Sequence, residues 1–167
     1  MRRTLLATAA LVAFFAADVT AANAQNAASV YQYGYRNTGS FAQNGRYNRG
    51  TIRQDGEYNY SRAVQQGRWN YLYQQQLGNR NRSLIDQFGN NNYAVTGQQG
   101  WDNAATTYQT GRSNTAGIAQ IGSNHRAYVE QEGQNNTMAT IQVGNGQHAE
   151  AHQSGDGNVG VIIQGGD

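Results

Sequence analysis

The chain has 167 residues, of which 38% are hydrophobic and 13% charged, and it contains 21 Gly, no Pro and no Cys. Its mean hydropathy of -0.76 leaves too little apolar material for the core of an ordinary globular enzyme. The low charge and the 10% aromatic content also exclude a typical disordered chain. We therefore expect hydrogen bonding and repetition, rather than bulk hydrophobicity or disulfide bonds, to order this chain.

Residues 1–24 have the features of a secretion signal peptide. Arg2 and Arg3 precede an apolar run from Leu5 to Ala17, and the small residues Ala22 and Ala24 predict cleavage before Gln25. The apolar run is shorter than the roughly 20 residues that span a bilayer, which disfavours a membrane anchor. The sequence thus predicts an exported protein whose single mature domain is residues 25–167.

The mature domain distributes its charges unevenly. It contains ten Arg, no Lys and nine acidic residues, so its net charge is only +1. Such a balance is not the basic footprint of a nucleic-acid-binding protein, and we expect no specific nucleic-acid partner. Residues 25–82 nevertheless carry a net charge of +6 and residues 83–167 a net charge of -5.

From residue 25 onward the sequence repeats every eleven residues without an insertion, which is typical of a repeat architecture. Each repeat has a Gln, a Gly two positions later and, in ten of twelve repeats, an Asn five positions after the Gln. His125 and Gln147 replace the Asn in the other two. The Gln residues are Gln32, Gln43, Gln54, Gln65, Gln76, Gln87, Gln98, Gln109, Gln120, Gln131, Gln142, Gln153 and Gln164. The Gly residues are Gly34, Gly45, Gly56, Gly67, Gly78, Gly89, Gly100, Gly111, Gly122, Gly133, Gly144 and Gly155. The Asn residues are Asn37, Asn48, Asn59, Asn70, Asn81, Asn92, Asn103, Asn114, Asn136 and Asn158.

Within each repeat, small or apolar residues alternate with exposed types. The fifth, seventh, ninth and eleventh positions after the Gln are Asn, a mostly small residue, a mostly apolar residue or Thr, and the next Gln. This period of two predicts a strand with one buried face. We expect strands of about five residues, from residues 27–31 to residues 159–163, each followed by an arc x-G-x-x-N. In that arc Gly permits positive φ, and Asn tolerates the left-handed region or bonds its own backbone.

Eleven residues cannot close a flat coil, because a coil needs one strand going out and another coming back. Two repeats, 22 residues, therefore form one rung, and the fold class is an all-β, cross-β β-solenoid with thirteen short strands in about six and a half rungs. In register, Gln32 stacks on Gln54 at one edge and Gln43 on Gln65 at the other. Each inward amide is satisfied by the next rung, and the Asn residues form a second ladder in the same way.

The ends of such a column expose unpaired strand edges that can serve as templates for another copy. We expect no capping segment at either end of the mature domain, and the last strand places Val159, Val161 and Ile163 on its outward face. The basic first half and the acidic second half favour a head-to-tail contact. Such a contact does not close, and it generates a filament.

Repeats such as QQGWDNAATTYQ (98–109) and QTGRSNTAGIAQ (109–120) resemble the repeat Q-x-G-x-x-N-x-A-x-x-x-Q of curlin, the subunit of curli amyloid fibres on bacterial surfaces. The resemblance implies secretion through an outer-membrane channel of a Gram-negative bacterium with accessory chaperones. It also implies nucleated assembly with a companion curlin subunit, and roles in biofilm matrix and in adhesion to host or abiotic surfaces. The chain has more repeats than enterobacterial curlins, and no glycine-rich leader is expected. The repeat stays intact to Gln164, which favours the major subunit over the minor nucleating one.

Other motifs give weaker functional indications. The GxGxxG pattern of Gly155–Gly160 is followed by too few residues for a dinucleotide-binding helix, so we expect no cofactor. His148, Glu150 and His152 share a strand face, with Glu130 one rung away. These residues are suitable weak metal ligands, but a solvated surface is the preferred interpretation and we expect no metal site.

No arrangement of a nucleophile and a base can be assembled, so we expect no catalytic residues and no enzyme activity. The main alternative function is a monomeric secreted β-solenoid adhesin or binding module. The irregular outward residues at the eighth position, such as Arg62, Tyr73 and Leu84, argue against a lattice-matching surface. Outward aromatic residues such as Tyr58 and Trp69 are suited to binding glycans or surfaces by stacking, or act only as strand formers.

Overall fold

The computed structural model describes residues 25–166, which form thirteen strands. The predicted signal peptide, residues 1–24, and Asp167 lie outside the described residues. The strands are β1 (Ala27–Tyr35), β2 (Thr38–Arg46), β3 (Arg49–Glu57), β4 (Tyr60–Arg68), β5 (Tyr71–Asn79), β6 (Arg82–Asn90), β7 (Tyr93–Trp101), β8 (Ala104–Arg112), β9 (Thr115–Ser123), β10 (Arg126–Gln134), β11 (Thr137–Asn145), β12 (His148–Asp156) and β13 (Val159–Gly166). Residues 25–166 contain no helix, and hence no helix that is long and apolar enough to cross a membrane.

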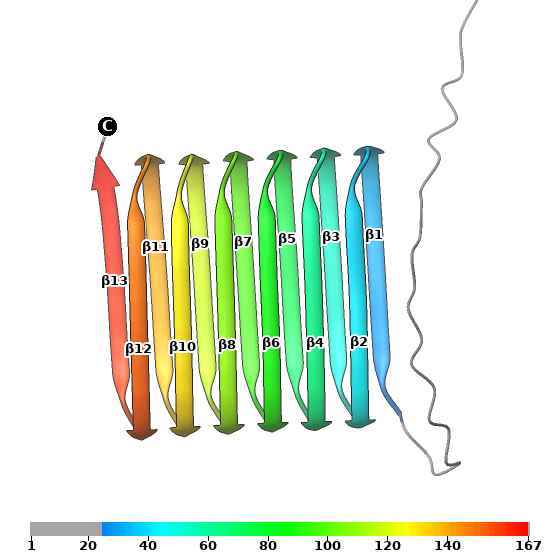
Figure 1. Cartoon of the computed structure of the whole chain (residues 1–167), viewed down its shortest axis with the longest axis vertical. Helices are drawn as coiled ribbons and strands as arrows, with labels where there is room; N and C mark the ends of the chain where they lie inside the picture. Colours follow the sequence, from blue (N-terminus) through cyan, green and yellow to red (C-terminus); the bar gives the residue numbers. More distant parts are fainter. Residues whose placement is uncertain (1–24, 167) are drawn as a thin grey trace, which may run out of the picture.

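The strands wind into two parallel sheets that face each other (Figure 1). The odd-numbered strands β1 to β13 form a seven-stranded sheet, and the even-numbered strands β2 to β12 form a six-stranded sheet. Each residue pairs with the residue 22 positions later, so that Gln32 lies beside Gln54 and Gln43 beside Gln65. The predicted β-solenoid, with thirteen strands and two strands in each 22-residue coil, is confirmed.

The core lies between the two sheets and follows the predicted alternation. Residues at the seventh, ninth and eleventh positions after each Gln are buried in the middle of the column, as Leu72, Gln74 and Gln76 are in β5. The apolar part of the core falls into two clusters. One contains Ile52, Ala63, Leu72, Ile85 and Ala94. The other contains Ala105, Ala116, Ile118, Ala127, Val129, Met138 and Ala151.

The strands are longer than predicted. Twelve contain nine residues and β13 contains eight, compared with the expected five. The arc Gly and the residue after it remain in the parallel ladder, because Gly34 still pairs with Gly56 and Tyr35 with Glu57. Glycine and polar residues at those positions resemble a turn, but the stacked coils pair their backbones through them. Only two residues separate consecutive strands.

The residue that takes the left-handed conformation at each turn is not the Asn. It is the residue just before the Asn, or before His125 at one turn, and it has φ between 54° and 61° at ten turns although it is Arg, Tyr, Trp, Asn, Asp or Ser. Its backbone N–H reaches the previous coil, as when Tyr58 N donates to Tyr35 O at 2.9 Å. The Asn follows the other predicted route and bonds its own backbone, since Asn37 Nδ2 donates to Tyr33 O at 2.8 Å.

Candidate assembly site

Two columns of Gln amides run the length of the solenoid, one along each sheet. In all eleven successive pairs the Nε2 of one Gln donates to the Oε1 of the Gln 22 residues later, at 2.7–2.9 Å. The seven Gln of the odd-numbered strands form one column and the six of the even-numbered strands form the other. Interior members such as Gln65 and Gln87 are fully buried. An unpaired buried amide is costly, and the stack supplies each one with partners.

A second hydrogen bond, to a backbone carbonyl, fixes the orientation of every amide in these columns from Gln43 onward. Gln54 Nε2 also donates to Thr38 O at 3.0 Å, and Gln65 Nε2 to Arg49 O at 3.1 Å. Each of these bonds crosses from one sheet to the other, so the Gln columns also join the two sheets. Because a backbone carbonyl can only accept, the amide nitrogen cannot exchange places with the oxygen. Both columns therefore have one polarity, with donors directed toward the C-terminal end.

The Asn residues form ladders at the turns. Asn70 is typical: its backbone N–H donates to Asn48 Oδ1 at 3.1 Å, and its Nδ2 donates to Gly89 O in the next coil at 2.9 Å. Its Oδ1 accepts the backbone N–H of Asn92 at 3.0 Å. An interior Asn thus bonds the backbone N–H of the turn residue and the carbonyl of the arc Gly in the next coil.

His125 takes the place of an Asn in this ladder. Its backbone N–H donates to Asn103 Oδ1 at 3.1 Å, and its Nδ1 accepts the backbone N–H of Gln147 at 3.2 Å. The Nε2 lies 3.1 Å from Ile121 O, so the neutral ring with its proton on Nε2 matches both contacts. This buried imidazole supplies one acceptor and one donor, as the Asn amide does elsewhere.

The repeated Gly residues permit the coils to stack closely. All twelve, from Gly34 to Gly155, have φ between 101° and 126°, a range that disfavours residues with a Cβ. A Cβ added at Gly89 would lie 2.0 Å from Gly111 O in the next coil. The space beside each Gly from Gly34 to Gly144 is therefore occupied by the backbone of the next coil.

At the ends of the column the ladders are open. Gln32 and Gln43 at one end, and Gln153 and Gln164 at the other, are partly exposed, unlike the interior Gln residues. No described residue donates to the Oε1 of Gln32 or Gln43, and the Nε2 of Gln153 and of Gln164 has a single described acceptor each, at Thr137 O and His148 O. In the interior of the column, every Gln amide nitrogen has two acceptors. The end strands likewise pair on one side only among residues 25–166.

The GxGxxG pattern is part of this end of the solenoid. Gly155 lies in β12 with φ 107°, Asn158 lies at the turn, and Gly160 lies in β13. A Cβ at Gly160 would come within 2.8 Å of the Met138 sulfur, so the residue provides space for core packing.

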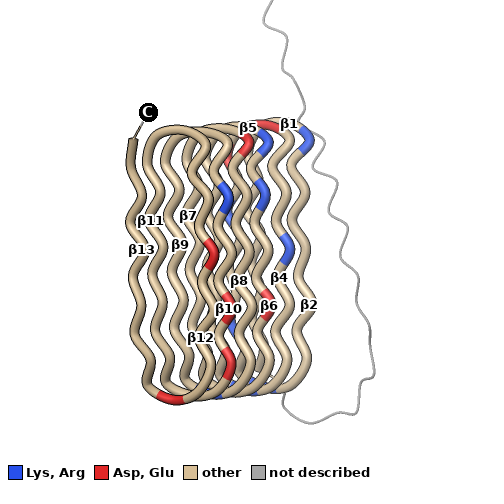
Figure 2. Tube along the Cα trace, turned by 60° about the vertical axis from the view of Figure 1, so that its left-hand side comes forward, with Lys and Arg blue, Asp and Glu red and all other residues tan. Residues whose placement is uncertain are grey.

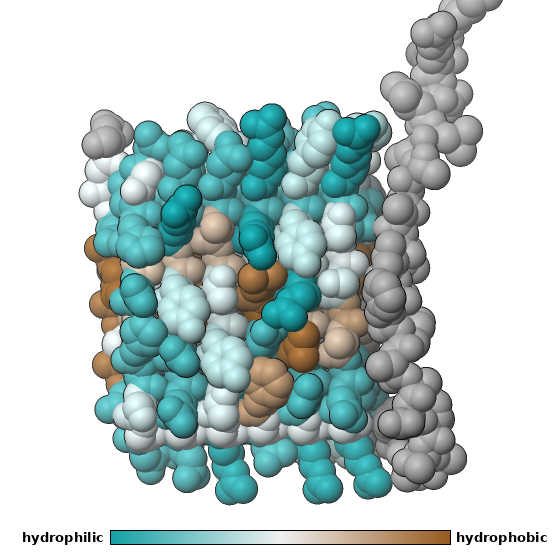
Figure 3. Space-filling view, in the orientation of Figure 1, coloured by the Kyte–Doolittle hydropathy of each residue, from teal (hydrophilic) through white to brown (hydrophobic). Residues whose placement is uncertain are grey.

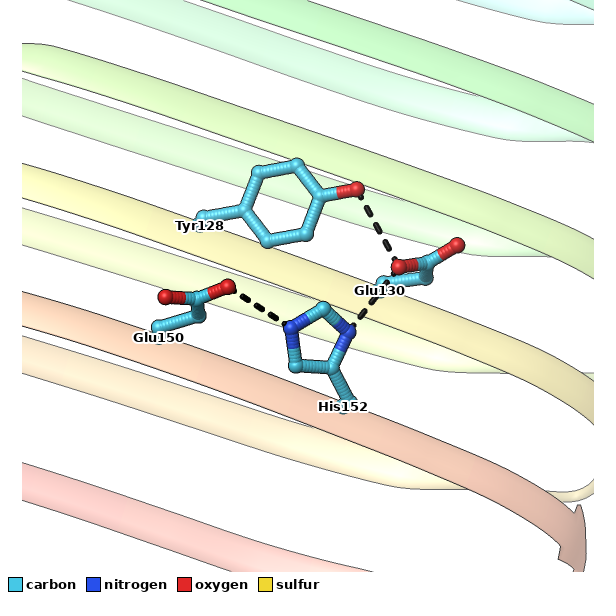
Figure 4. A network of polar contacts seen from close by, with 4 residues as sticks. All are labelled: Tyr128, Glu130, Glu150 and His152. Carbon is cyan, nitrogen blue, oxygen red and sulfur yellow. Dashed lines mark hydrogen bonds and ion pairs between the residues drawn. The ribbon is translucent and has the colours of Figure 1, made fainter.

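The outward His and acidic residues of β10 and β12 form a small exposed ion-pair network (Figure 4). His152 Nε2 lies 2.8 Å from Glu150 Oε1, and His152 Nδ1 lies 2.9 Å from Glu130 Oε2. Tyr128 Oη donates to the same Glu130 oxygen at 3.2 Å. The hydrogen bonds to Glu150 and Glu130 raise the pKa of His152 above 6.5, and burial is the main cause of a raised Tyr128 pKa. Among residues 25–166 no group of three His, Cys or acidic residues is arranged to hold a metal ion.

Charge is concentrated on one of the two sheets (Figure 2). In the seven-stranded sheet the only charged residues are Arg49, Arg53, Asp55 and Glu57, which all lie in β3. The other six strands of this sheet carry no charged residue. The even-numbered strands carry most of the other described charges. Val159, Val161 and Ile163 of β13 are 76%, 61% and 72% exposed, and Figure 3 shows hydrophobic side chains at the edge where β13 lies. The described column therefore has a charged face and a face that is nearly free of charge.

Sequence reasoning did not identify two features of the structure. The first is the left-handed turn residue described above, for which no common residue type gives a signal. The second is Gln74, a buried amide at an otherwise apolar or Thr position, whose Nε2 donates to Ser83 Oγ at 2.9 Å. Its position, nine residues after Gln65, marks it as inward, and that spacing was the available signal.

Comparison with known proteins identifies the repeat. A family model described as the curlin-associated repeat matches residues 25–56 and, separately, residues 100–133. No curated protein matches the chain. The first match covers β1, β2 and most of β3, and the second covers β8, β9 and most of β10. Both contain the Gln, Gly and Asn positions that build the ladders, so the chain contains curlin-associated repeats in these two segments.

Proposed function

We propose that the protein is a structural subunit of extracellular curli-type amyloid fibres, in which copies polymerise end to end. Curlin repeats imply self-assembly into extracellular fibres, and a β-solenoid built from ladders points to a structural protein without enzymatic activity. The observation that carries the proposal is the open state of the ladders at both ends of the described column. Gln153 and Gln164 each keep one Nε2–H without a described acceptor, and the Oε1 atoms of Gln32 and Gln43 have no described donor.

The energetics of the ends favours addition of another copy. Each end exposes two strand edges, which are ready templates for pairing. A docked copy would supply a backbone ladder and continue the Gln and Asn columns. The net contribution of one such hydrogen bond is only ~1 kcal/mol, but a junction forms many at once. The same pairing repeated along an axis at ~4.8 Å per coil is the cross-β arrangement.

The finer biological roles are part of the same proposal. Residues 1–24 direct export, the mature domain begins at Gln25, and secretion uses an outer-membrane channel with accessory chaperones. A companion curlin subunit nucleates assembly, and this chain is the major subunit, because its repeat stays intact through Gln164. The fibres contribute to biofilm matrix and to adhesion and colonisation of surfaces.

The test is polymerisation of the purified chain beginning at Gln25. We expect a soluble protein that converts, after a lag, to thioflavin-positive fibres with diffraction at ~4.7 Å and ~10 Å. Preformed fibres or a companion subunit should shorten the lag. A protein that stays monodisperse for days at neutral pH, even with seeds, would contradict the proposal and favour the monomeric adhesin.

A matched pair of variants tests whether the ends are the site of growth. Gln164→Glu replaces Nε2, which has one N–H without a described acceptor, with a carboxylate oxygen and should slow elongation at least tenfold. Gln66→Glu makes the same change on the exposed outer face of β4 and should elongate nearly as fast as the unmodified chain. Equal elongation rates in the two variants would mean that growth does not occur through the Gln columns.

A further inference from the structure

Because the number of described strands is odd, the outermost strand at both ends of the column belongs to the same sheet, and each end is stepped. β1 and β13 are both in the seven-stranded sheet, whereas β2 and β12 are the outermost strands of the six-stranded sheet. At one end β13 therefore extends beyond β12, and at the other β1 extends beyond β2 (Figure 1). When two copies meet end to end, the protruding strand of one must fit the recess of the other.

The amide columns determine which ends can meet. The β12–β13 end has free Nε2 donors at Gln153 and Gln164, and the β1–β2 end has free Oε1 acceptors at Gln32 and Gln43. A head-to-tail contact places donors against acceptors. A contact between two like ends would place oxygen against oxygen, or N–H against N–H, in a region that becomes buried, and unpaired buried amides are costly. Copies of the column therefore meet head to tail.

We infer that successive copies in the fibre are related by a half turn about the fibre axis, so that the seven-stranded sheet of one copy continues as the six-stranded sheet of the next. This inference rests on the proposed function, since it describes the junction of that polymer. From one strand to the next, the solenoid itself advances by a half turn and half a rung. Thirteen such steps amount to an odd number of half turns and a rise of about 31 Å, at ~4.8 Å per rung.

The arrangement without rotation is less favourable. It would place β1 of the next copy directly on β13, and the position above β12 would contain no strand. The gap between β12 and β2 of the next copy would be about 9.6 Å, twice the spacing at which strands can pair. The second N–H of Gln153 Nε2 would then have no acceptor, and both facing strand edges would lose their backbone ladders. The half turn leaves no gap, because β1 of the next copy lies on β12 and β2 of the next copy lies on β13.

The half turn also brings opposite charges together. In the continued register, Gln153 meets Gln32 of the next copy, and Gln164 meets its Gln43. Asp156, the last residue of β12, then lies beside the turn that contains Arg36 of the next copy. Without rotation, that arginine would instead lie over the uncharged turn at Gly146. The half turn therefore adds a favourable charge contact to the continuous ladder.

Cysteine cross-linking distinguishes the two junctions, and the chain itself contains no Cys. The half turn places Val161 of β13 beside Ser40 of the next copy, at the ~4.8 Å spacing of neighbouring strands, which a disulfide can bridge. The unrotated junction places Val161 beside Ser29 instead. The double variant Val161→Cys with Ser40→Cys should form covalent multimers in oxidised fibres. The matched variant Val161→Cys with Ser29→Cys should remain mostly monomeric on a denaturing gel without reductant.

A third double variant, Ser40→Cys with Arg62→Cys, controls for oxidation, because these residues are partners within one copy and should cross-link before assembly. Helical reconstruction of unmodified fibres gives an independent reading, with an expected rotation near 180° for each rise of about 31 Å. Fibres that link through Ser29, that link through neither pair, or that show almost no rotation would overturn the half turn but leave the proposed function intact. Failure to form fibres would overturn both.

Discussion

Gln65 Nε2 donates to Gln87 Oε1 at 2.9 Å, although 22 residues of chain separate them. Gln65 also accepts from Gln43 at 2.7 Å and donates to Arg49 O at 3.1 Å. One buried side chain therefore satisfies groups in two neighbouring coils and in the opposite sheet. A polar residue occupies a position that most folds reserve for apolar side chains.

Replacing this residue should therefore destabilise the column strongly. Gln65→Leu leaves the Oε1 of Gln87 without its donor, and it removes one of the two acceptors of Gln43 Nε2 and the hydrogen bond to Arg49 O. We expect a loss of about 3 kcal/mol or more in unfolding free energy. Gln66→Leu makes the same change one residue later on the exposed face and should change stability by less than about 0.5 kcal/mol. Denaturant unfolding of both variants provides the comparison, and equal losses would mean that the inward and outward faces are reversed.

The arc glycines give a second matched pair. Gly89→Ala requires a Cβ at φ 118° and 2.0 Å from Gly111 O, so we expect a loss above about 3 kcal/mol or failure to fold. Gly97→Ala, on the outward face of β7, meets no atom within 4 Å and has no positive φ, so it should be neutral or slightly stabilising. Thermal unfolding followed by circular dichroism measures both. A tolerated Gly89→Ala would contradict the close stacking of coils at this position.

The Asn ladder should be sensitive to charge in a pH-dependent way. Asn70 Nδ2 donates to Asn48 Oδ1, Gln66 O and Gly89 O, so Asn70→Asp directs a carboxylate oxygen at three acceptors. Burial and this repulsion raise the pKa of the new carboxyl group. The destabilisation should therefore be largest above the folded-state pKa and should decrease as the pH falls below it. Asn91→Asp, at an exposed turn position, should show little of this dependence when both are unfolded at pH 4 and pH 7. Parallel behaviour of the two variants would argue against the ladder.

His152 should give a smaller pH effect of the same sign, because stability again falls as the pH rises. Its hydrogen bonds to Glu150 and Glu130 raise its pKa above the ordinary 6.5, so the folded chain binds the proton more tightly than the unfolded chain. The added stability is fully present below pH 6.5 and is lost as the pH rises through the folded-state pKa. An NMR titration should show the pKa of His152 falling in Glu150→Gln and unchanged in Glu132→Gln, whose side chain lies elsewhere on β10. A similar titration in both variants would show that Glu150 does not hold the imidazolium.

Thr96 offers a stabilising substitution. It is fully buried in β7, and its Oγ1 has no hydrogen-bond partner among the described residues. Thr96→Val keeps the shape and removes the unpaired hydroxyl, so it should raise unfolding free energy by about 1 kcal/mol. Thr106→Val, on the outward face of β8, should have almost no effect in the same denaturation experiment. A destabilised Thr96→Val would show that the hydroxyl has a partner in solution.

The overall fold could be predicted because the interior is encoded in a strict phase. Gln, Gly and Asn recur at fixed spacing, and alternation around them identifies the inward positions, which leads directly to the two-strand coil. The same periodicity correctly brings Glu130 and His152 together, since they are 22 residues apart and lie within 2.9 Å. Pairs of this kind follow from the register alone.

Strand length and turn conformation could not be predicted in the same way. Gly34 and Tyr35 have turn-like character when considered locally, and only the stacked neighbour coil keeps them in the ladder. The left-handed residue is Tyr58 at one turn and Trp69 at another, types that normally disfavour positive φ. Closure of the coil imposes the conformation, and the side chain does not signal it.

That turn position separates the chemistry of the surface from the geometry of the fold. The backbone at Arg36, Tyr58, Asp102 and Ser113 has nearly the same φ, although these side chains differ in charge, size and polarity. The two rims of the column can therefore carry cationic, aromatic, acidic or neutral groups at intervals of one coil without altering the interior. One constant backbone conformation accommodates many different surface side chains, and new chemical groups can be introduced along the rims without redesigning the core.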